Sequence, residues 1–270
     1  MKSLMQMSQR GENLGNVDSK NIHFPAQGAS LLAQIERDHF WFTARRYAII
    51  KMLKAAFAPE TLGKGVLGVD VGCGTGFTAV SLTESGFPTL GVDVYDGFSE
   101  FKKLKKGLGF VQGSIFSIEP EPEFDFLLLL DVLEHVEDDA GFLEQSMKLV
   151  KPGGVAIITS PAFSWLWSSA DDYAGHLRRY TKKTMQDLIR KLGPPVQVEV
   201  LSYFYGTTLL PYWMSRLAPQ KEGAAVLKRE SELPKWLNRA LDGLLKTESS
   251  LLRRGGLPLG SSVFAMIRKK

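Results

Sequence analysis

An acid and three glycines stand close together at residues 70–76, which read Asp-Val-Gly-Cys-Gly-Thr-Gly. Glycines at alternate positions let the backbone turn tightly, and they let a ligand approach where a Cβ would otherwise stand. Asp70 comes two residues before the first glycine, and a carboxylate at such a turn suits a cationic ligand better than a pyrophosphate. We therefore expect this segment to bind a nucleotide-like ligand that carries positive charge.

A second acid, Asp93, ends an apolar run and follows Gly72 by 21 residues. A carboxylate at this distance can accept hydrogen bonds from both hydroxyl groups of a ribose. Val94 and Tyr95 follow directly and are able to pack on an adenine ring. Phe77 occupies the place of the last glycine in the dinucleotide fingerprint G-x-G-x-x-G, which argues against a nicotinamide-dependent (NAD) oxidoreductase and leaves it as a lesser alternative.

Two histidines are the candidates for proton transfer. His135 follows Asp131 in the segment Asp-Val-Leu-Glu-His-Val, and His176 lies in a long loop at residues 160–179. An unperturbed imidazole titrates near neutral pH, so either side chain can act as a general base, with His176 as the first candidate. For His135 the alternative is a structural role, in which it orients the turn or packs against a cofactor.

The same loop and the residue after it carry side chains that we expect to contact an acceptor molecule: Trp165, Trp167, Arg178, Arg179 and Tyr180. A long aromatic and charged loop after a central strand is more often functional than plain scaffold. The arginines suit an acidic or phosphorylated acceptor. The alternative is that ion pairs anchor the loop.

The elements that must position these residues alternate between strand-like and helix-like segments. The glycine turn lies between an apolar run at 67–71 and a helix-like stretch at 77–85, as at the start of a βαβ unit. Residues 124–132 are almost continuously apolar, as a central parallel strand buried on both faces would be. Strands are expected at 67–71, 88–94, 110–112, 124–132, 155–159, 196–204 and 261–268. The pattern predicts a doubly wound α/β fold with a seven-stranded, mostly parallel sheet.

Four segments occur in a characteristic order: the glycine turn, the acid at position 93, Asp-Val-Leu-Glu-His-Val at 131–136 and Lys-Pro-Gly-Gly at 151–154. Together they resemble the class I S-adenosylmethionine (SAM)-dependent methyltransferases, over residues 30–202 and the final strand. The stretches His-Phe-Trp-Phe-x-x-Arg-Arg at 39–46 and Gly-His-x-Arg-Arg-Tyr-Thr at 175–181 resemble bacterial members of the type-11/12-like, ubiquinone-biosynthesis-like group. The resemblance implies a Rossmann-like methyltransferase fold with an antiparallel last strand, SAM as the cofactor and methyl transfer as the reaction.

The resemblance also implies roles for single residues. In this family the acid of the glycine turn, here Asp70, reaches the amino group of the methionine part of SAM, directly or through water. An arginine of the preceding helix, here Arg45 or Arg46, can meet the SAM carboxylate. The strand end at Asp131 lies beside the methyl group that is transferred.

The adenine contact departs from the family pattern. The family usually has an Asp after the third strand, whereas this chain has Gly-Ser-Ile, so we expect Ser114 and Ile115 to make the contact. The expected cofactor contacts are, in full, Asp70, Gly72, Cys73, Gly74, Thr75, Gly76, Asp93, Val94, Tyr95, Ser114, Ile115, Asp131, Val132 and Arg45.

The reaction expected from this resemblance is simple for the protein to support. The sulfonium of SAM makes its methyl group electrophilic, so the protein mainly has to hold the acceptor in line with the bond that breaks. A base is needed only where the acceptor must lose a proton. Two histidines near the site favour O-methylation of a small-molecule or lipid-linked acceptor. The alternatives are C-methylation of a quinone or isoprenoid-like ring and a non-catalytic partner protein that binds SAM.

The chain of 270 residues divides into five predicted parts. Residues 1–27 are a disordered lead-in, 28–60 form N-terminal helices, 61–206 form the cofactor-binding core, and 261–270 add its last strand. Between the sixth and seventh strands, 207–260 are too many residues for a turn and predict a helical insertion. Its interleaved apolar and basic residues can cover a substrate, form a homodimer, lie on an anionic membrane or pack on their own domain.

Composition excludes several other classes. The single cysteine, Cys73, excludes an internal disulfide framework and a cysteine-based zinc cluster, and no metal is expected. A net charge of +4 without a clear basic stripe gives no reason to expect nucleic acid. No apolar run reaches about 18 residues, and residues 1–20 lack a signal-peptide core. We therefore expect a cytoplasmic protein, with membrane association through the C-terminal helices left open.

Overall fold

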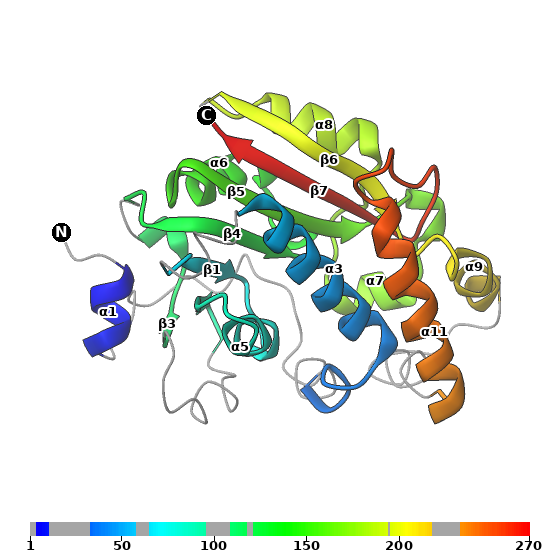
Figure 1. Ribbon diagram of the computed structural model, residues 1–270. Coiled ribbons are helices and arrows are strands. Elements are labelled where there is room, and N and C mark those ends of the chain that lie inside the picture. Colours follow the sequence, from blue (N-terminus) through cyan, green and yellow to red (C-terminus); the bar gives the residue numbers. More distant parts are fainter. Residues whose placement is uncertain are drawn as a thin grey trace.

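A central sheet of seven strands organises the chain, described here from a computed structural model for residues 4–10, 33–57, 65–95, 109–117, 121–193, 195–217 and 233–270. The strands lie in the order β3-β2-β1-β4-β5-β7-β6 (Figure 1). Their bounds are β1 Gly68–Val71, β2 Thr89–Asp93, β3 Phe110–Gln112, β4 Phe124–Leu130, β5 Val150–Pro161, β6 Val196–Phe204 and β7 Ser262–Lys269.

The direction of the strands follows the prediction. Strand β1 is parallel to β2 and β4, β2 to β3, and β4 to β5, whereas β7 runs antiparallel to both β5 and β6. This confirms the doubly wound, mostly parallel sheet with an antiparallel last strand. The chain winds away in opposite directions from β1 and β4, and sheets of this kind bind ligands at the carboxyl ends of the strands beside such a switch point.

Strand β4 shows why the central strands could be predicted from the sequence. Phe126 and Leu128 pack into one hydrophobic cluster, while Leu127 and Leu129 pack into the other, and all four are fully buried. Side chains of a strand alternate between the two faces of its sheet, so a sheet that is covered on both sides requires apolar residues at every position.

Helices cover both faces of the sheet. Buried residues of α3, α5 and α11 pack on one face, and those of α1, α6 and α8 pack on the other. The helices are α1 Leu4–Arg10, α3 Phe40–Ala56, α5 Phe77–Glu84, α6 Asp139–Lys148, α7 Ser169–Ala174, α8 Lys182–Arg190, α9 Leu209–Leu217 and α11 Lys235–Glu248. Shorter 3-10 turns lie at Ile115–Ser117, Leu133–His135, Ser164–Leu166 and Ser249–Leu251.

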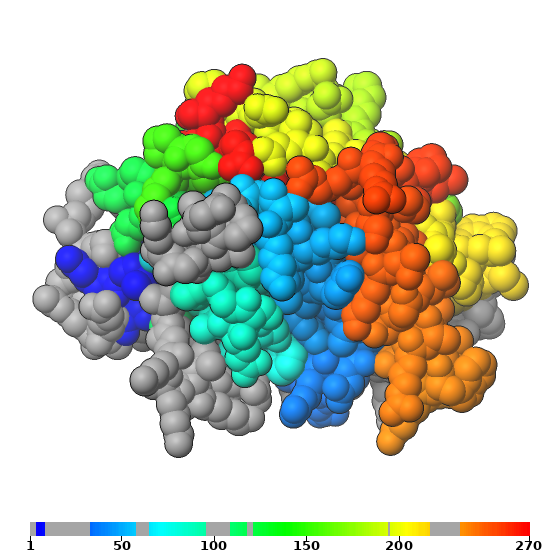
Figure 2. Space-filling view, in the orientation of Figure 1, coloured from blue at the N-terminus to red at the C-terminus, as the bar shows by residue number. Residues whose placement is uncertain are grey.

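The predicted insertion contributes α9 and α11 at one end of the molecule. Helix α11 lies beside α3, far from it in sequence, and Figure 2 shows the two helices adjacent on one face. Asn238 accepts a hydrogen bond from the Phe40 backbone N–H at 2.8 Å, and Thr43 donates one to Asp242 at 2.6 Å. The inner face of α11 therefore packs on its own domain.

Two segments differ from the prediction. The lead-in expected to be disordered contains α1, whose Leu4 is buried in the core, while residues 11–27 lie outside the described part of the chain. The fifth strand, expected at 155–159, is longer in the structure, and β5 includes residues 151–154. Its pairing with β4 shifts register between Phe124 and Phe126. Within the described ranges, no helix is both long and apolar enough to cross a bilayer.

Candidate active site

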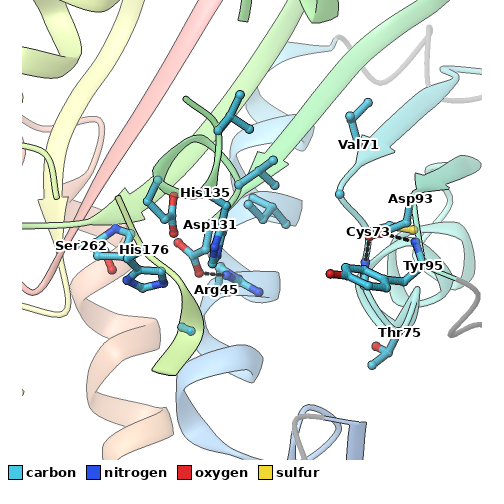
Figure 3. A pocket seen from close by; sticks show the side chains of 18 of the residues that line it. Arg45, Val71, Cys73, Thr75, Asp93, Tyr95, Asp131, His135, His176 and Ser262 are labelled. Carbon is cyan, nitrogen blue, oxygen red and sulfur yellow. Dashed lines mark hydrogen bonds and ion pairs between the residues drawn. The ribbon is translucent and has the colours of Figure 1, made fainter. Parts of the chain in front are cut away.

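A cavity of about 660 Å³ lies at the carboxyl ends of β1, β2, β4 and β5, within the size range of small-molecule and cofactor sites. Residues from α3, the loop after β5, α9 and the start of β7 complete its wall. Figure 3 shows the side chains in two groups, with Cys73, Asp93 and Tyr95 in one and Arg45, Asp131, His135 and His176 in the other. The cavity thus brings together residues that are more than 130 positions apart.

Most of the predicted site residues line this cavity. The wall contains Arg45, Gly72, Cys73, Gly74, Thr75, Asp93, Val94, Tyr95, Ser114, Ile115, Asp131, Val132, His135, His176 and Arg179. The predicted residues outside the wall are Asp70, Gly76, Trp165, Trp167, Arg178 and Tyr180.

The three glycines of the turn adopt a backbone conformation that other residues rarely take. Gly72, Gly74 and Gly76 have φ angles of 76°, 56° and 75°, in the left-handed region that favours glycine. A Cβ on Gly72 would also come within 2.6 Å of Val132, whereas one on Gly74 would meet no described atom within 4 Å. Backbone geometry explains all three glycines, and contact with the strand-end residue Val132 adds a packing reason for the first.

Asp93 ties the glycine turn to the second strand. Its carboxylate accepts hydrogen bonds from the backbone N–H groups of Gly74 at 2.7 Å and Tyr95 at 3.0 Å. Burial raises the pKa of Asp93, and these backbone hydrogen bonds oppose the rise. Each carboxylate oxygen has a second lone pair, so the side chain keeps the capacity to accept from a ligand hydroxyl.

Asp70 lies behind the turn rather than on the wall. Its side chain is almost fully buried, and its Oδ1 atom has no hydrogen-bond partner among the described residues. Burial raises the pKa of Asp70 to about 7, with Arg45 opposing the rise and Glu36 and Asp93 adding to it. A buried carboxyl with a perturbed pKa beside a cavity is a typical feature of a functional site.

The tertiary structure separates the two arginines of α3. Arg45 faces the cavity and forms an ion pair with Asp131, whose φ of 55° is unusual for a residue other than glycine. Arg46 donates instead to the backbone carbonyls of Glu36 and Arg37, at 2.7 Å each. Of the two arginines considered for a cofactor carboxylate, Arg45 is the one in position, and Arg46 fixes the segment before α3.

His176 lies at the other end of the cavity beside Asp171, a carboxylate in α7. The Nδ1 atom of His176 is 2.7 Å from Asp171 Oδ1, and the Asp171 side chain is almost fully buried. Arg179 donates to both Asp171 oxygens, at 2.8 and 2.9 Å. Although burial acts to raise it, the pKa of Asp171 is held well below its usual range by hydrogen bonds from His176 and Arg179.

His135 and Glu134 complete this end of the cavity. The rings of His135 and His176 meet edge to face, with centroids 4.7 Å apart. Glu134 is fully buried and accepts a hydrogen bond from Ser160 at 3.1 Å, and burial together with nearby Asp131 raises its pKa well above the usual value. One ligand atom from each of Glu134, His135 and His176 lies within 4.8 Å of the others, so this group could hold a cation although no metal was expected.

Four residues predicted to contact the acceptor point elsewhere. Trp165 is 55% exposed, and Trp167 donates its indole N–H to Asp172 at 2.8 Å. Arg178 pairs with Asp139 at 3.1 Å, and the Tyr180 hydroxyl donates to the same carboxylate at 2.7 Å. The alternative of a loop anchored by ion pairs therefore describes Arg178 and Tyr180 better.

Arg179 lies in the wall but is not available as a free cation. Besides Asp171, its guanidinium donates to the backbone carbonyl of Ala162 at 3.0 Å. An arginine with this set of partners holds the loop in place rather than waiting for an acidic acceptor.

Sequence reasoning missed several wall residues. They are Glu36, Trp41, Phe42, Glu134, Asp171, Tyr212, Arg216, Ser261 and Ser262. Trp41 stacks on Tyr205 with centroids 3.7 Å apart, and Tyr212 lies 6.1 Å from Trp41. Asp171, five residues before His176, and Glu134, next to His135, carried a local signal, as did Trp41 and Phe42 in the motif at 39–46. The remaining residues reach the cavity from distant segments.

Comparison with known proteins agrees with this geometry. A family model described as "Methyltransferase domain" matches residues 41–196, more than half of the chain. The ubiquinone biosynthesis O-methyltransferase of Rickettsia bellii (strain OSU 85-389) is 30% identical over 99 residues, which are 34% of this chain and 40% of that protein. The match thus spans about two fifths of the relative's length.

Solved structures show the same fold at low sequence identity. An S-adenosylmethionine-dependent methyltransferase from Mesorhizobium loti superposes with a TM-score of 0.50 at 18% identity, over 81% of this chain and 96% of that one. The [4+2]-cyclase SpnF superposes equally well, with a TM-score of 0.50 at 17% identity, over 78% of this chain and 79% of that one. The fold is therefore shared by proteins described by different reactions, and the function has to be argued from the site.

Proposed function

We propose that this chain, which belongs to the methyltransferase-domain family of class I SAM-dependent methyltransferases, moves the methyl group of SAM to a hydroxyl oxygen of a small-molecule or lipid-linked acceptor. One observation carries the proposal. A single cavity has the glycine turn with Asp93 on one side and a histidine held by a buried carboxylate on the other. The first group suits the cofactor, and the second suits the removal of a proton from the acceptor.

The residues of the first group fit SAM. Asp93 is placed to accept from the ribose hydroxyls, and Ser114 and Ile115 line the wall where adenine would pack. Buried Asp70, with one oxygen unpartnered among the described residues, suits the positive charge of the methionine amino group. Arg45 is paired with Asp131, but its Nε–H has no hydrogen-bond partner among the described residues and suits the carboxylate of the methionine part. When bound, SAM supplies a methyl group made electrophilic by its sulfonium.

The second group supplies the acid–base chemistry. His176 lies in the wall with one ring nitrogen hydrogen-bonded to Asp171. We assign it the role of the base that accepts the proton of the acceptor hydroxyl. His135, edge-on to His176, orients that ring and is the second candidate for the base. Arg179, bonded to Asp171 and the backbone, keeps the loop around His176 closed.

The cavity favours an acceptor with an apolar or aromatic part. Trp41 and Tyr212 form an aromatic side of the wall, where a flat ring can stack. The relative from Rickettsia bellii is named for O-methylation in ubiquinone biosynthesis, which agrees with a hydroxylated ring as acceptor. C-methylation of a quinone or isoprenoid-like ring uses the same wall and is the alternative that product analysis must separate.

An apolar and basic outer surface also supports an acceptor held at a membrane. Leu210 and Met214 on α9 are 63% and 58% exposed, and Trp236 on α11 is 71% exposed. Lys235 and Arg239 lie on the same helix as Trp236 and are exposed. Apolar residues flanked by cations are typical of helices that lie on anionic lipid, with a homodimer as the alternative use of this face.

The decisive experiment uses SAM with an isotope-labelled methyl group and an extract of the source cells. The products are separated into organic, aqueous and macromolecular fractions, and the labelled product is examined for a methoxy carbon by NMR. We expect label in a methoxy group of an organic-soluble compound, and less of it in Asp93→Asn when SAM is supplied below saturation. Label on a ring carbon, in the macromolecular fraction or in no fraction would each contradict the proposal.

A further inference from the structure

Asp171 makes more hydrogen bonds than its place in helix α7 requires. As the third residue of that helix it closes a capping box, in which the Ser168 backbone N–H donates to Asp171 Oδ2 at 2.8 Å. The Ser168 hydroxyl of the same cap also donates to Oδ2, at 3.3 Å. Three donors from outside the cap converge on this carboxylate: His176 Nδ1, Arg179 Nε and Arg179 Nη2. A helix cap explains the contacts from Ser168, and the remaining three need another reason.

The contacts from Arg179 fix the charge of Asp171. A guanidinium is always cationic and donates only, so a carboxylate that receives two of its N–H groups is stabilised as an anion. The side chains of both residues are almost fully buried, so solvent does not weaken the pair.

The charge of Asp171 in turn determines which ring nitrogen of His176 carries the hydrogen. An ionised carboxylate can only accept, so the nitrogen 2.7 Å away, Nδ1, must carry the hydrogen. In the neutral ring the lone pair then lies on Nε2, at the opposite edge. Glu134, the other carboxyl near His176, accepts instead from the Ser160 hydroxyl at 3.1 Å.

We propose that Asp171 is a positioning residue, which is held by Arg179 and keeps His176 in the tautomer whose Nε2 accepts the proton of the acceptor hydroxyl. This inference rests on the proposed function. In the step, a bond forms between the acceptor oxygen and the methyl carbon, while the bond from that carbon to sulfur breaks and its electron pair stays on sulfur. The hydroxyl proton moves to Nε2. Asp171 then stabilises the imidazolium through the hydrogen bond at Nδ1.

Arg179 has a defined part in this arrangement. A buried carboxylate beside a histidine could take the proton itself, and the cost of burying a charge would favour that outcome. Two hydrogen bonds from Arg179 oppose it, so the proton remains on the imidazole until solvent removes it. Arg179 therefore acts on the reaction through Asp171 and has no need to touch the acceptor.

The first test reads the tautomer directly. In the full chain with 15N-labelled histidine, long-range 1H–15N correlations distinguish an Nδ1–H from an Nε2–H imidazole. We expect the Nδ1–H pattern for His176 in the native protein and a mixture or the Nε2–H pattern in Asp171→Asn. Asp172→Asn is the matched control, because its carboxylate is one residue away and bonds to Trp167 instead. A pattern unchanged in Asp171→Asn overturns the inference.

Asp171→Asn leaves Arg179 buried without its anion and can destabilise the fold. The double variant Asp171→Asn with Arg179→Gln removes the charge together with its partner, and circular dichroism verifies its folding. Its His176 spectrum is expected to match that of the single variant. A native-like Nδ1–H spectrum in the folded double variant also overturns the inference.

The second test separates positioning from mere support of the fold. The rate of label transfer from SAM into the organic cell extract is measured for the native protein, Asp171→Asn, His176→Gln and the variant carrying both. We expect Asp171→Asn to lower the rate about 100-fold, with no further loss when His176 is already replaced. S-Adenosylhomocysteine binding, measured by calorimetry, should change by no more than about two-fold. If Asp171→Asn lowered the rate equally in the native and the His176→Gln backgrounds, Asp171 would have a structural role only.

Failure of the proposed function gives a different result. In that case the native protein transfers no label to a hydroxyl. The histidine spectra still decide whether Asp171 sets the tautomer of His176.

Discussion

The two ends of the cavity are built in different ways. The glycine-turn half, which holds the turn at 72–76, Asp93 and Tyr95, is joined by contacts over short distances in the chain. Gly74 and Asp93, for example, are 19 residues apart. The histidine half, which holds His176, Asp171 and the aromatic wall, joins segments such as Trp41 and Tyr205, which are 164 residues apart. Local spacing can therefore reveal the first half. In the second half it can reveal only the pair of Asp171 and His176, which are five residues apart, whereas the aromatic wall exists only once the sheet has formed.

The two halves also differ in how their buried acids are balanced. In the glycine-turn half, burial raises the pKa of Asp70 and of Asp93. In the histidine half, Asp171 is equally buried, but Arg179 and His176 hold its pKa low. One half carries carboxyl groups that a cationic ligand would stabilise, and the other is charge-balanced within the protein. This difference predicts that damage to the first half appears in cofactor affinity and damage to the second half in the rate.

The largest expected effect belongs to the histidine half. His176→Gln should lower the rate of methyl transfer by about 100- to 10,000-fold, because a positioned base contributes that much. Binding of S-adenosylhomocysteine, measured by calorimetry, should stay within about two-fold of the native value. His39→Gln is the control, since His39 caps α3 and lies outside the wall. A large loss of cofactor affinity in His176→Gln would contradict the prediction that the histidine half governs the rate and the glycine-turn half governs affinity.

The next effect concerns Asp70 and the pH dependence of stability. Burial raises the pKa of Asp70 to about 7 in the folded protein from an ordinary value of 3.8, so the native state binds more protons than the unfolded state between about pH 4 and pH 7. The free energy of unfolding should therefore fall as pH rises through that window, by at most about 4 kcal/mol. Urea unfolding at pH 5 and pH 8 measures the change.

Asp70→Asn should remove this pH dependence and unfold at higher urea than the native protein at pH 8. The same variant should bind S-adenosylhomocysteine more weakly, because an amide does not balance the amino group of the ligand. Stability and affinity would then move in opposite directions, as expected for a buried acid kept for a ligand. Loss of both at pH 8 would instead identify Asp70 as a structural residue.

A smaller effect is expected for the ribose acid. Asp93→Asn keeps an oxygen for the Gly74 backbone N–H but loses the charge that strengthens hydrogen bonds to the ribose. The affinity for S-adenosylhomocysteine should fall about 10- to 100-fold, or about 1.4–2.7 kcal/mol. The rate at saturating SAM should change much less. Asp187→Asn, on the exposed side of α8, is the control and should leave both unchanged. A rate loss as large as that of His176→Gln would count against the comparison.

The smallest effect tests whether the histidine half receives its acceptor at a membrane. Trp236→Ser should weaken binding to vesicles of mixed neutral and anionic phospholipid by about three- to ten-fold in a sedimentation assay, because one exposed indole is lost. Trp165→Ser is matched to it, as an exposed tryptophan on another part of the surface. Equal losses in the two variants, or no binding by the native protein, would leave the dimer as the alternative for this face.

Much of the fold and of the glycine-turn half could be predicted from sequence. The run at 124–132 is apolar because the strand is buried on both faces. The turn contains glycines because its backbone is left-handed. The antiparallel direction of β7 came from the family resemblance, because alternation along one strand does not reveal its partner. The exposed position of Trp165 and the pairing of Arg178 with Asp139 could not be predicted, because both depend on how the loop after β5 packs.

The adjacent arginines of α3 show what local sequence could not predict, namely which of the two faces the cavity. Arg45 and Arg46 are chemically identical, and the pattern offered both for the same task. A helix turns about 100° per residue, so the two side chains leave α3 in different directions and meet different neighbours. One reaches Asp131 in the cavity, and the other reaches carbonyl groups of the preceding segment.

By itself, the sequence determined the elements, the glycine turn and the acids that follow it, because each depends on residues close together in the chain. The tertiary structure decided which histidine stands beside an ionised acid, which arginine faces the cavity and which aromatic residues form its wall. Asp171 and His176 are five residues apart, but the other choices depend on contacts between distant segments. Electrostatic and packing interactions act through space, and only the folded chain sets the distances over which they act.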